Sequence, residues 1–175
     1  MSPRLAAALL LTLSGCPASR PTTYTLPPRL APAVARFVVP VGRATRDGAA
    51  SPVVFAADGR VTREGVALLR VSARSIVAPE GPALATLGEG GELAVPGASQ
   101  RVRLTAAGVQ RSDGVQVTRR DDGRLVLRNP EGEEATSPWT LECPAEAAPT
   151  AALVLLLVDG LDRAASPAQT PREPP

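Results

Sequence analysis

The sequence contains no histidine and no lysine, so arginine supplies all of its 19 basic residues. Histidine is the commonest general acid–base residue and the commonest metal ligand, and its absence removes both roles. Without lysine, a serine nucleophile also lacks the Ser–Lys arrangement as an alternative to a histidine base. We therefore expect a protein that is not an enzyme and that uses no cofactor.

Aromatic residues and net charge are also low. One Trp, one Tyr and two Phe make up 2% of the chain, so any core must be built from Val, Leu, Ile and Ala. The formal net charge of +2 is too small to favour nucleic acid as a partner. Asp121-Asp122 and Glu133-Glu134 are paired acids, but neighbours on a strand point to opposite faces and both pairs lie beside glycines. We interpret them as solvated turns, and we predict neither a catalytic nor a metal site.

The first 16 residues contain the most specific motif. Arg4 precedes an apolar run from Leu5 to Leu13, which has the length of a signal-peptide core and is too short to cross a bilayer. The run ends in Leu13-Ser14-Gly15-Cys16, which is a branched apolar residue, two small residues and a cysteine. This motif resembles the lipobox of bacterial lipoprotein precursors. The alternative is an ordinary secretory signal, because Ser14-Gly15 also suits a conventional signal peptidase.

The resemblance implies how the mature protein is anchored. Residues 1–15 would be removed, Cys16 would carry a diacylglyceryl group on its sulfur, and its new amino group would be acylated. Two or more acyl chains anchor a protein stably in a bilayer, because each buried CH₂ group contributes about 0.8 kcal/mol. Residue 17 is Pro, whereas Asp at that position retains such proteins in the inner membrane in the best-known sorting scheme. We expect a lipid-anchored envelope protein that contacts the membrane through this lipid, with the outer membrane as its location.

Proline-rich segments flank one central domain. Residues 16–34 are dense in proline and low in apolar side chains, which predicts an extended tether. Residues 164–175 have a similar composition and are predicted to be a disordered tail. The remaining stretch, 35–163, has the length of a single domain.

Glycines punctuate this domain at near-regular intervals. They close short polar segments at positions 65, 81, 97, 114 and 132, and most of the intervening units contain a second turn signal such as Asp58-Gly59 or Asp122-Gly123. The segments between turns alternate apolar and polar residues, as in 115–128. We predict a mainly β domain, an antiparallel meander of eight to ten strands that forms either an open sheet or a small barrel.

The last apolar segment is different. Residues 151–158 form an unbroken Ala, Leu and Val run after Pro149 and before Asp159-Gly160, which suits a turn or a frayed helix end. The composition favours a C-terminal helix over a buried strand, and such a helix would cover the apolar face of the meander. With its lipobox and its Asp-Gly hairpins, the whole chain looks like lipoproteins of GC-rich bacteria that have no assigned activity.

Three further features have alternative interpretations. Cys143 would be the only thiol left after lipidation, and it could be a buried apolar-like residue, an intermolecular disulfide partner, or a redox or ligand site. Trp139 is expected to be a core residue, with a ligand platform as the alternative. The arginines of the polar face are expected either to keep the sheet soluble or to bind phosphate or carboxylate groups, and they are Arg101, Arg103, Arg119, Arg120, Arg124 and Arg128.

Two functions follow from these observations. The first is a non-catalytic, membrane-anchored envelope lipoprotein with a structural or protein-interaction role, whose partner would be another envelope protein. The second is a binding module whose arginine face holds anionic envelope lipid or an anionic polysaccharide.

Overall fold

The computed structural model describes residues 31–98 and 100–165. The expected signal peptide, the lipidation site at Cys16, the tether up to residue 30 and the tail from residue 166 lie outside the described residues. None of the described helices is long and apolar enough to cross a membrane.

The described residues contain twelve strands, so the expected number of eight to ten was too low. Three of the strands have only three residues each, which is too short for an alternating pattern to stand out. The strands are β1 (Gly42–Arg46), β2 (Val53–Phe55), β3 (Arg60–Arg63), β4 (Val66–Val71), β5 (Ser75–Val77), β6 (Ala83–Leu87), β7 (Glu92–Ala94), β8 (Val102–Thr105), β9 (Gly108–Arg111), β10 (Gln116–Arg119), β11 (Arg124–Arg128) and β12 (Glu134–Glu142).

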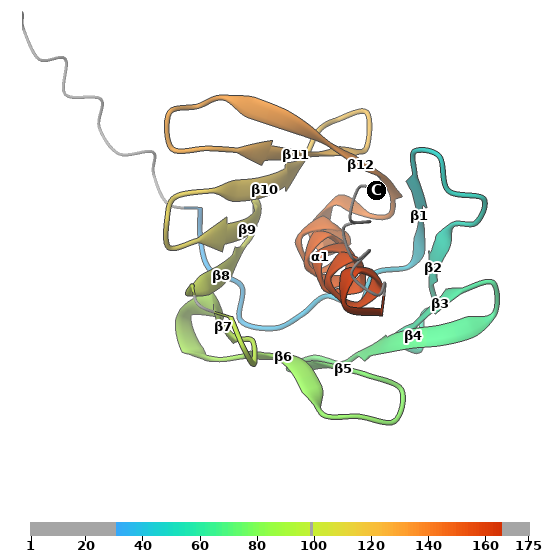
Figure 1. The fold of residues 1–175 in the computed structure, drawn as a ribbon. Coiled ribbons are helices and arrows are strands. Elements are labelled where there is room, and N and C mark those ends of the chain that lie inside the picture. Colours follow the sequence, from blue (N-terminus) through green and yellow to red (C-terminus); the bar gives the residue numbers. More distant parts are fainter. Residues whose placement is uncertain (1–30, 99, 166–175) are drawn as a thin grey trace, which may run out of the picture. The chain divides into compact units, whose positions relative to one another are not determined.

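The strands form a closed antiparallel barrel in which each pairs with its neighbours in sequence. Closure comes from β1 and β12, which pair from Arg43 opposite Glu142 to Arg46 opposite Trp139. Figure 1 shows the strands as a ring, with β1 beside β12. The predicted meander is therefore confirmed, and of the two predicted forms the structure is the barrel.

The hairpins use the turn chemistry expected from their sequences. Gly123 has φ 86° between β10 and β11, a backbone conformation that other residues adopt only with strain. The register of the β10–β11 hairpin places Val117 opposite Leu127, so both apolar side chains lie on one face of the sheet. The turn between β4 and β5 lacks glycine, and there the hydroxyl of Ser72 accepts a hydrogen bond from the Ser75 N–H at 3.0 Å.

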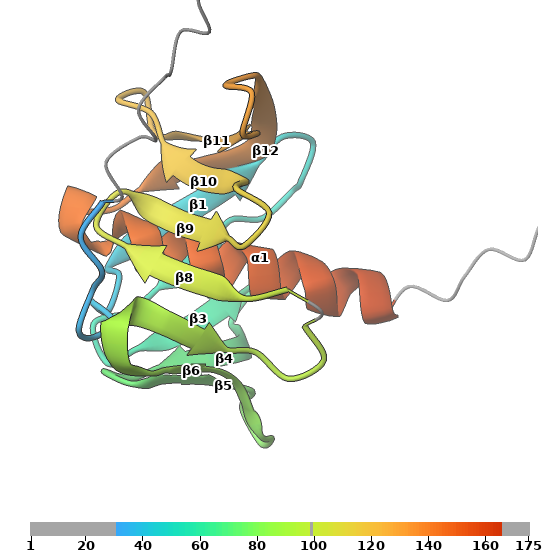
Figure 2. The same cartoon turned by 90° about the vertical axis from the view of Figure 1, so that its left-hand side faces the viewer.

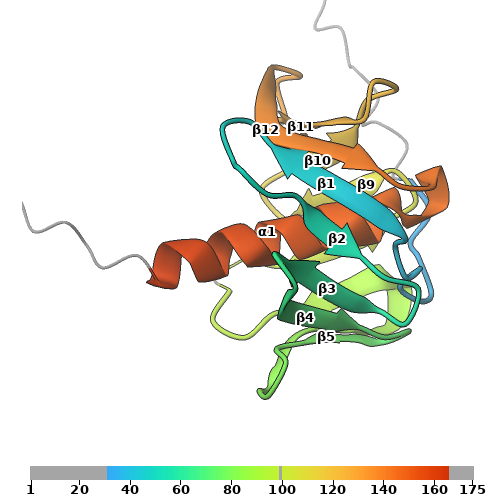
Figure 3. The ribbon, with the colours of Figure 1, turned by 90° about the vertical axis from the view of Figure 1, so that its right-hand side faces the viewer.

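Helix α1 (Ala148–Ala165) occupies the interior of the barrel, which confirms the prediction of a C-terminal helix. A short 3₁₀ helix, η2 (Ala145–Ala147), leads into it from β12. Figure 1 looks along the helix inside the ring, and Figures 2 and 3 show it running through the barrel and emerging at one end. The helix continues past Gly160, where the sequence suggested a turn or frayed end.

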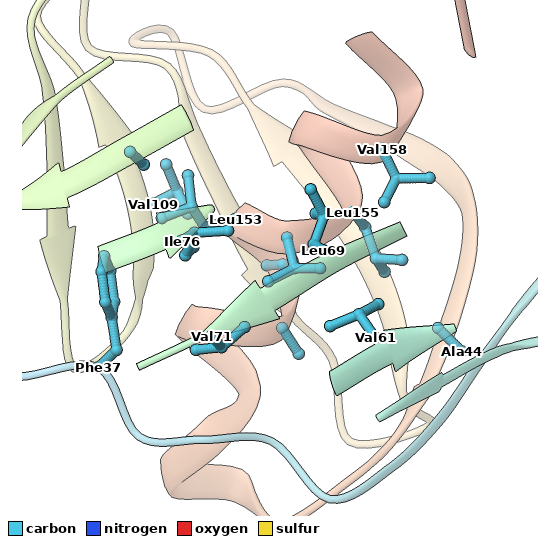
Figure 4. Packing of buried hydrophobic residues seen from close by; sticks show 14 of the residues in the cluster. Phe37, Ala44, Val61, Leu69, Val71, Ile76, Val109, Leu153, Leu155 and Val158 are labelled. Carbon is cyan, nitrogen blue, oxygen red and sulfur yellow. The ribbon is translucent and has the colours of Figure 1, made fainter. Parts of the chain in front are cut away.

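The core lies between this helix and the inner face of the strands. Figure 4 shows Leu153, Leu155 and Val158 of α1 directed toward strand residues that include Leu69 and Ile76. All five side chains are buried, and the core cluster as a whole is aliphatic apart from Phe37, Phe55 and Trp139. A sequence poor in aromatic residues thus fills its barrel by placing an apolar helix inside it.

The segment before β1 crosses the end of the barrel where α1 begins. Ala33 forms an isolated bridge with Thr105, and the Val34 N–H donates to the Leu104 carbonyl at 3.2 Å. Phe37 is buried in the core, and the Val38 N–H donates to Oγ1 of Thr150 on α1 at 3.2 Å. Residues 32–34, which were predicted to belong to the tether, therefore hydrogen-bond to the barrel.

Candidate binding surface on the barrel wall

The six candidate arginines fall into two groups in the structure. Arg119, Arg120, Arg124 and Arg128 belong to the β10–β11 hairpin, whereas Arg103 is on β8 and Arg101 immediately precedes it. The two groups differ in how their guanidinium groups are occupied, and this difference decides which of them is open to a ligand.

Three of the four hairpin arginines form ion pairs with acidic side chains. Arg120 and Arg128 both form ion pairs with Glu134 on β12, and Arg124 pairs with Asp47 at 3.1 Å. The hydrogen bond from Arg120, followed by that from Arg128, holds the pKa of the Glu134 carboxyl below its usual value. The carboxylate is therefore ionised across the neutral range, and it neutralises much of the positive charge on this side.

Arg119 has a different environment from the other three. Its NH1 group donates to the carbonyl of Cys143 at 3.2 Å, and its Nε atom is buried with no hydrogen-bond partner among the described residues. It lines a hollow of about 280 Å³ together with Arg120, beside the start of α1. The structure therefore does not bring the four hairpin arginines together on one open face.

Arg101 and Arg103 border a larger hollow of about 520 Å³ on the outside of the barrel. It crosses β7, β8 and β9; β8 and β9 lie on the side of the barrel that faces the viewer in Figure 2. The hollow is lined by Glu92, Leu93, Arg101, Val102, Arg103, Gln110, Arg111, Ser112 and Gly114. We call this site the β7–β9 groove.

Strand register explains why the polar residues of the groove share one face. Glu92 lies opposite Arg103, and Arg103 lies opposite Gln110, so these three side chains form a row across the sheet. Arg101 lies in the next row, where its carbonyl accepts the N–H of Ser112 at 2.8 Å. Side chains two residues apart on a strand point the same way, which places Arg101 beside Arg103.

The guanidinium groups of the groove differ in their contacts. Arg103 donates from Nε to the Gly90 carbonyl at 2.9 Å, which holds the side chain in place. Arg111 donates to Oε1 of Gln100 at 2.7 Å and pairs with Asp113 at 2.6 Å. The Arg101 guanidinium has neither a hydrogen bond nor an ion pair with any part of the chain that the structure describes. Among the described residues, Arg101 is thus the groove arginine whose guanidinium is wholly open to a ligand.

Sequence reasoning missed Arg111, Glu92 and Gln110 as groove residues. Arg111 follows Gln110 just before the Ser112-Asp113-Gly114 turn, and Glu92 follows Gly91. The turns beside these residues could be predicted from the sequence. Their cross-strand partners could not, because they depend on the register of β7, β8 and β9. Only that register shows that Glu92, Arg103 and Gln110 meet.

Trp139 and Cys143, the other two candidate residues, lie within or beside the packed core. Trp139 is 2% exposed and belongs to the core cluster, as predicted. Cys143 is half-buried, and burial raises the pKa of its thiol, an effect that the nearby Arg119 guanidinium opposes. Within the described residues, no group of three or more His, Cys, Asp or Glu side chains is placed to hold a metal ion.

A third hollow, of a different character, lies near the C-terminal half of α1. It has a volume of about 290 Å³ and is mostly apolar, with Leu84, Val95, Leu157 and Leu161 among its lining residues. It lacks charged side chains, so it does not share the chemistry of the β7–β9 groove.

Comparison of the chain with protein-family models, with curated proteins and with solved structures found no match.

Proposed function

We propose that this chain is a non-catalytic lipoprotein of the cell envelope, anchored through lipid on Cys16, with the outer membrane as its location. In this proposal the barrel is the part that acts beyond the membrane, as a structural or protein-interaction module. The lipobox-like motif Leu13-Ser14-Gly15-Cys16 carries the anchoring part of the proposal.

The filled interior of the barrel supports a role for its outer surface. Barrels that carry small molecules hold them inside, whereas here α1 occupies that space and packs against the strands. Contacts with a partner would therefore be made on the outer wall or at the barrel ends. The lack of histidine and lysine supports a binding role over catalysis.

The anchor can be tested by the intact mass of the protein extracted from membranes. The expected mass is that of residues 16–175 plus diacylglyceryl and acyl groups, and Cys16→Ser should lose the modification. Cys143→Ser is the matched control and should keep it. An unmodified chain that is cut elsewhere would overturn the proposal and leave a secreted β-barrel.

A second candidate function is the binding of anionic envelope material by the barrel wall. The observation that favours it is Arg101, whose guanidinium has no partner within the described residues and which lies beside Arg103 in the β7–β9 groove. This candidate predicts that binding weakens as salt rises, because exposed charges are screened. Binding that ignores salt would count against it.

A further inference from the structure

We propose that the β7–β9 groove is a subsite for one carboxylated sugar unit of an acidic polysaccharide. This inference deepens the second candidate function and rests on it. Arg101 and Arg103 would hold the carboxylate, and Glu92 and Gln110 would accept hydrogen bonds from sugar hydroxyls.

The cationic half of the groove is prepared for a planar anion. Arginine has five N–H donors in a fixed fork that fits a carboxylate through two parallel hydrogen bonds. Arg103 uses only its Nε in the contact with Gly90, so its terminal nitrogens have no partner within the described residues. Arg101, on the same face, uses none of its donors there. Neither guanidinium needs to break an ion pair before it binds a ligand.

The acidic residue in the groove distinguishes a sugar from a simple anion. Glu92 lies directly opposite Arg103, yet the two side chains form no ion pair in the part of the chain that the structure describes. A sulfate or a phosphodiester near Glu92 would meet a like charge and offer it no hydrogen-bond donor. A hydroxylated ligand offers such donors, and the Gln110 amide beside it can accept or donate. The groove thus suits one negative charge next to several hydroxyls.

The surroundings of the groove disfavour a bilayer surface as the source of the anion. Glu89 is exposed in the short 3₁₀ helix η1 (Glu89–Gly91), and Asp113 lies in the turn after β9. These acids lie close in sequence to Glu92 and Arg111, which line the groove. A broad membrane surface rich in anionic lipid would meet the exposed Glu89 together with the groove, whereas a polymer chain can lie along the groove with one carboxylate at Arg101 and Arg103. The volume of about 520 Å³ falls in the range of ordinary ligand sites.

The test is a titration of the purified full chain, in a non-ionic detergent, with short oligomers of galacturonic acid. We expect saturable binding that weakens as salt rises from about 0.05 M to about 0.5 M. Methyl-esterified oligomers, which keep the hydroxyls and lose the charge, should bind at least about tenfold more weakly. Equal binding of the two oligomers, or no binding of either, would overturn the inference.

Three variants assign the site. Arg101→Gln combined with Arg103→Gln should weaken binding by at least about tenfold, because it removes charge-assisted hydrogen bonds. Arg120→Gln combined with Arg128→Gln removes the same charge from the side occupied by Glu134, and it should leave the affinity nearly unchanged. Glu92→Gln should weaken sugar binding, whereas it would strengthen the binding of a simple anion. Strengthened binding in Glu92→Gln would overturn the sugar assignment.

Two further probes separate this inference from the function on which it rests. Inorganic phosphate and vesicles of phosphatidylglycerol are titrated under the same conditions. If either one binds in an Arg101- and Arg103-dependent manner while the acidic oligomer does not, anion binding stands and the sugar assignment is wrong. If none of the three binds, the anion-binding function fails as well.

Discussion

The indole N–H of Trp139 on β12 donates a hydrogen bond to Oδ2 of Asp159 on α1 at 3.0 Å. The guanidinium of Arg46 on β1 lies 3.5 Å from Oδ1 of the same carboxylate and 5.7 Å from the centre of the Trp139 ring. Arg46 and Trp139 are directly opposed on the two strands that close the barrel. One carboxylate therefore joins the central helix to the closing seam of the barrel.

Loss of this carboxylate should destabilise the protein. Asp159→Ala leaves the buried indole N–H without an acceptor, which costs about 1–3 kcal/mol. Asp159→Asn keeps an acceptor and should cost less. Trp139 is the only tryptophan, so its fluorescence reports unfolding in urea directly. Glu80→Ala, at an exposed acid on the loop after β5, is the control. If Asp159→Ala unfolds at the same urea concentration as the control, this hydrogen bond does not stabilise the fold.

Two adjacent leucines on α1 provide a matched test of the central helix. Leu155 is 1% exposed and Leu156 is 36% exposed. Leu155→Ala should cost about 2–5 kcal/mol because it removes buried methyl groups and leaves a cavity inside the barrel. Leu156→Ala should cost less than about 1 kcal/mol. Equal losses in urea unfolding would show that α1 does not occupy the interior.

Alanine substitutions at two glycines distinguish the effect of backbone strain from that of steric overlap. Gly59 has φ 82° and Gly65 has φ 79°, so alanine at either position is strained by about 1–2 kcal/mol. A Cβ at Gly59 would lie 2.1 Å from the Val71 carbonyl oxygen, whereas one at Gly65 would meet nothing within 4 Å. Gly59→Ala should therefore lower the melting temperature more than Gly65→Ala. A smaller effect at Gly59 would contradict the close approach of β4.

The ion pairs of Glu134 predict loss of stability in acid. Arg120 and Arg128 lower the pKa of Glu134 in the folded protein, so its contribution is full above the unfolded pKa and is lost as the pH falls through the folded value. Glu134→Gln should reduce stability near neutral pH, and its difference from wild type should shrink as the pH falls below the ordinary pKa of a glutamate and through the lowered pKa of Glu134 in the folded protein. Glu131→Gln, at a neighbouring exposed acid, is the control. A difference that does not change with pH would rule out the ion pairs as its cause.

Partial burial predicts slow alkylation of Cys143. Burial raises the pKa of its thiol, so less of the reactive thiolate is present at mildly alkaline pH than in the unfolded chain. In a Cys16→Ser background Cys143 is the only thiol, and its reaction with iodoacetamide should be several-fold slower than in urea. An equal rate in both conditions would mean that the folded barrel neither shields nor perturbs Cys143.

The separation of the arginines could not have been predicted from spacing. Arg120, Arg124 and Arg128 look like a basic cluster in the sequence, but Glu134 on β12 and Asp47 just after β1 neutralise them. Asp47 is far from Arg124 along the chain and reaches it because β1 pairs with β12. The groove around Arg103 likewise depends on partners from β7 and β9.

The sequence by itself determined the local features of this protein. Asp122-Gly123 encodes a tight turn, the alternation around Val117 encodes a strand with one buried face, and the Ala/Leu run after Pro149 encodes a helix. Each of these depends on the backbone preferences of a few adjacent residues. Only the tertiary structure decided that the sheet closes, that α1 lies inside it, and which arginines remain open. Those features depend on strand twist and register summed around the whole barrel, which no local pattern contains.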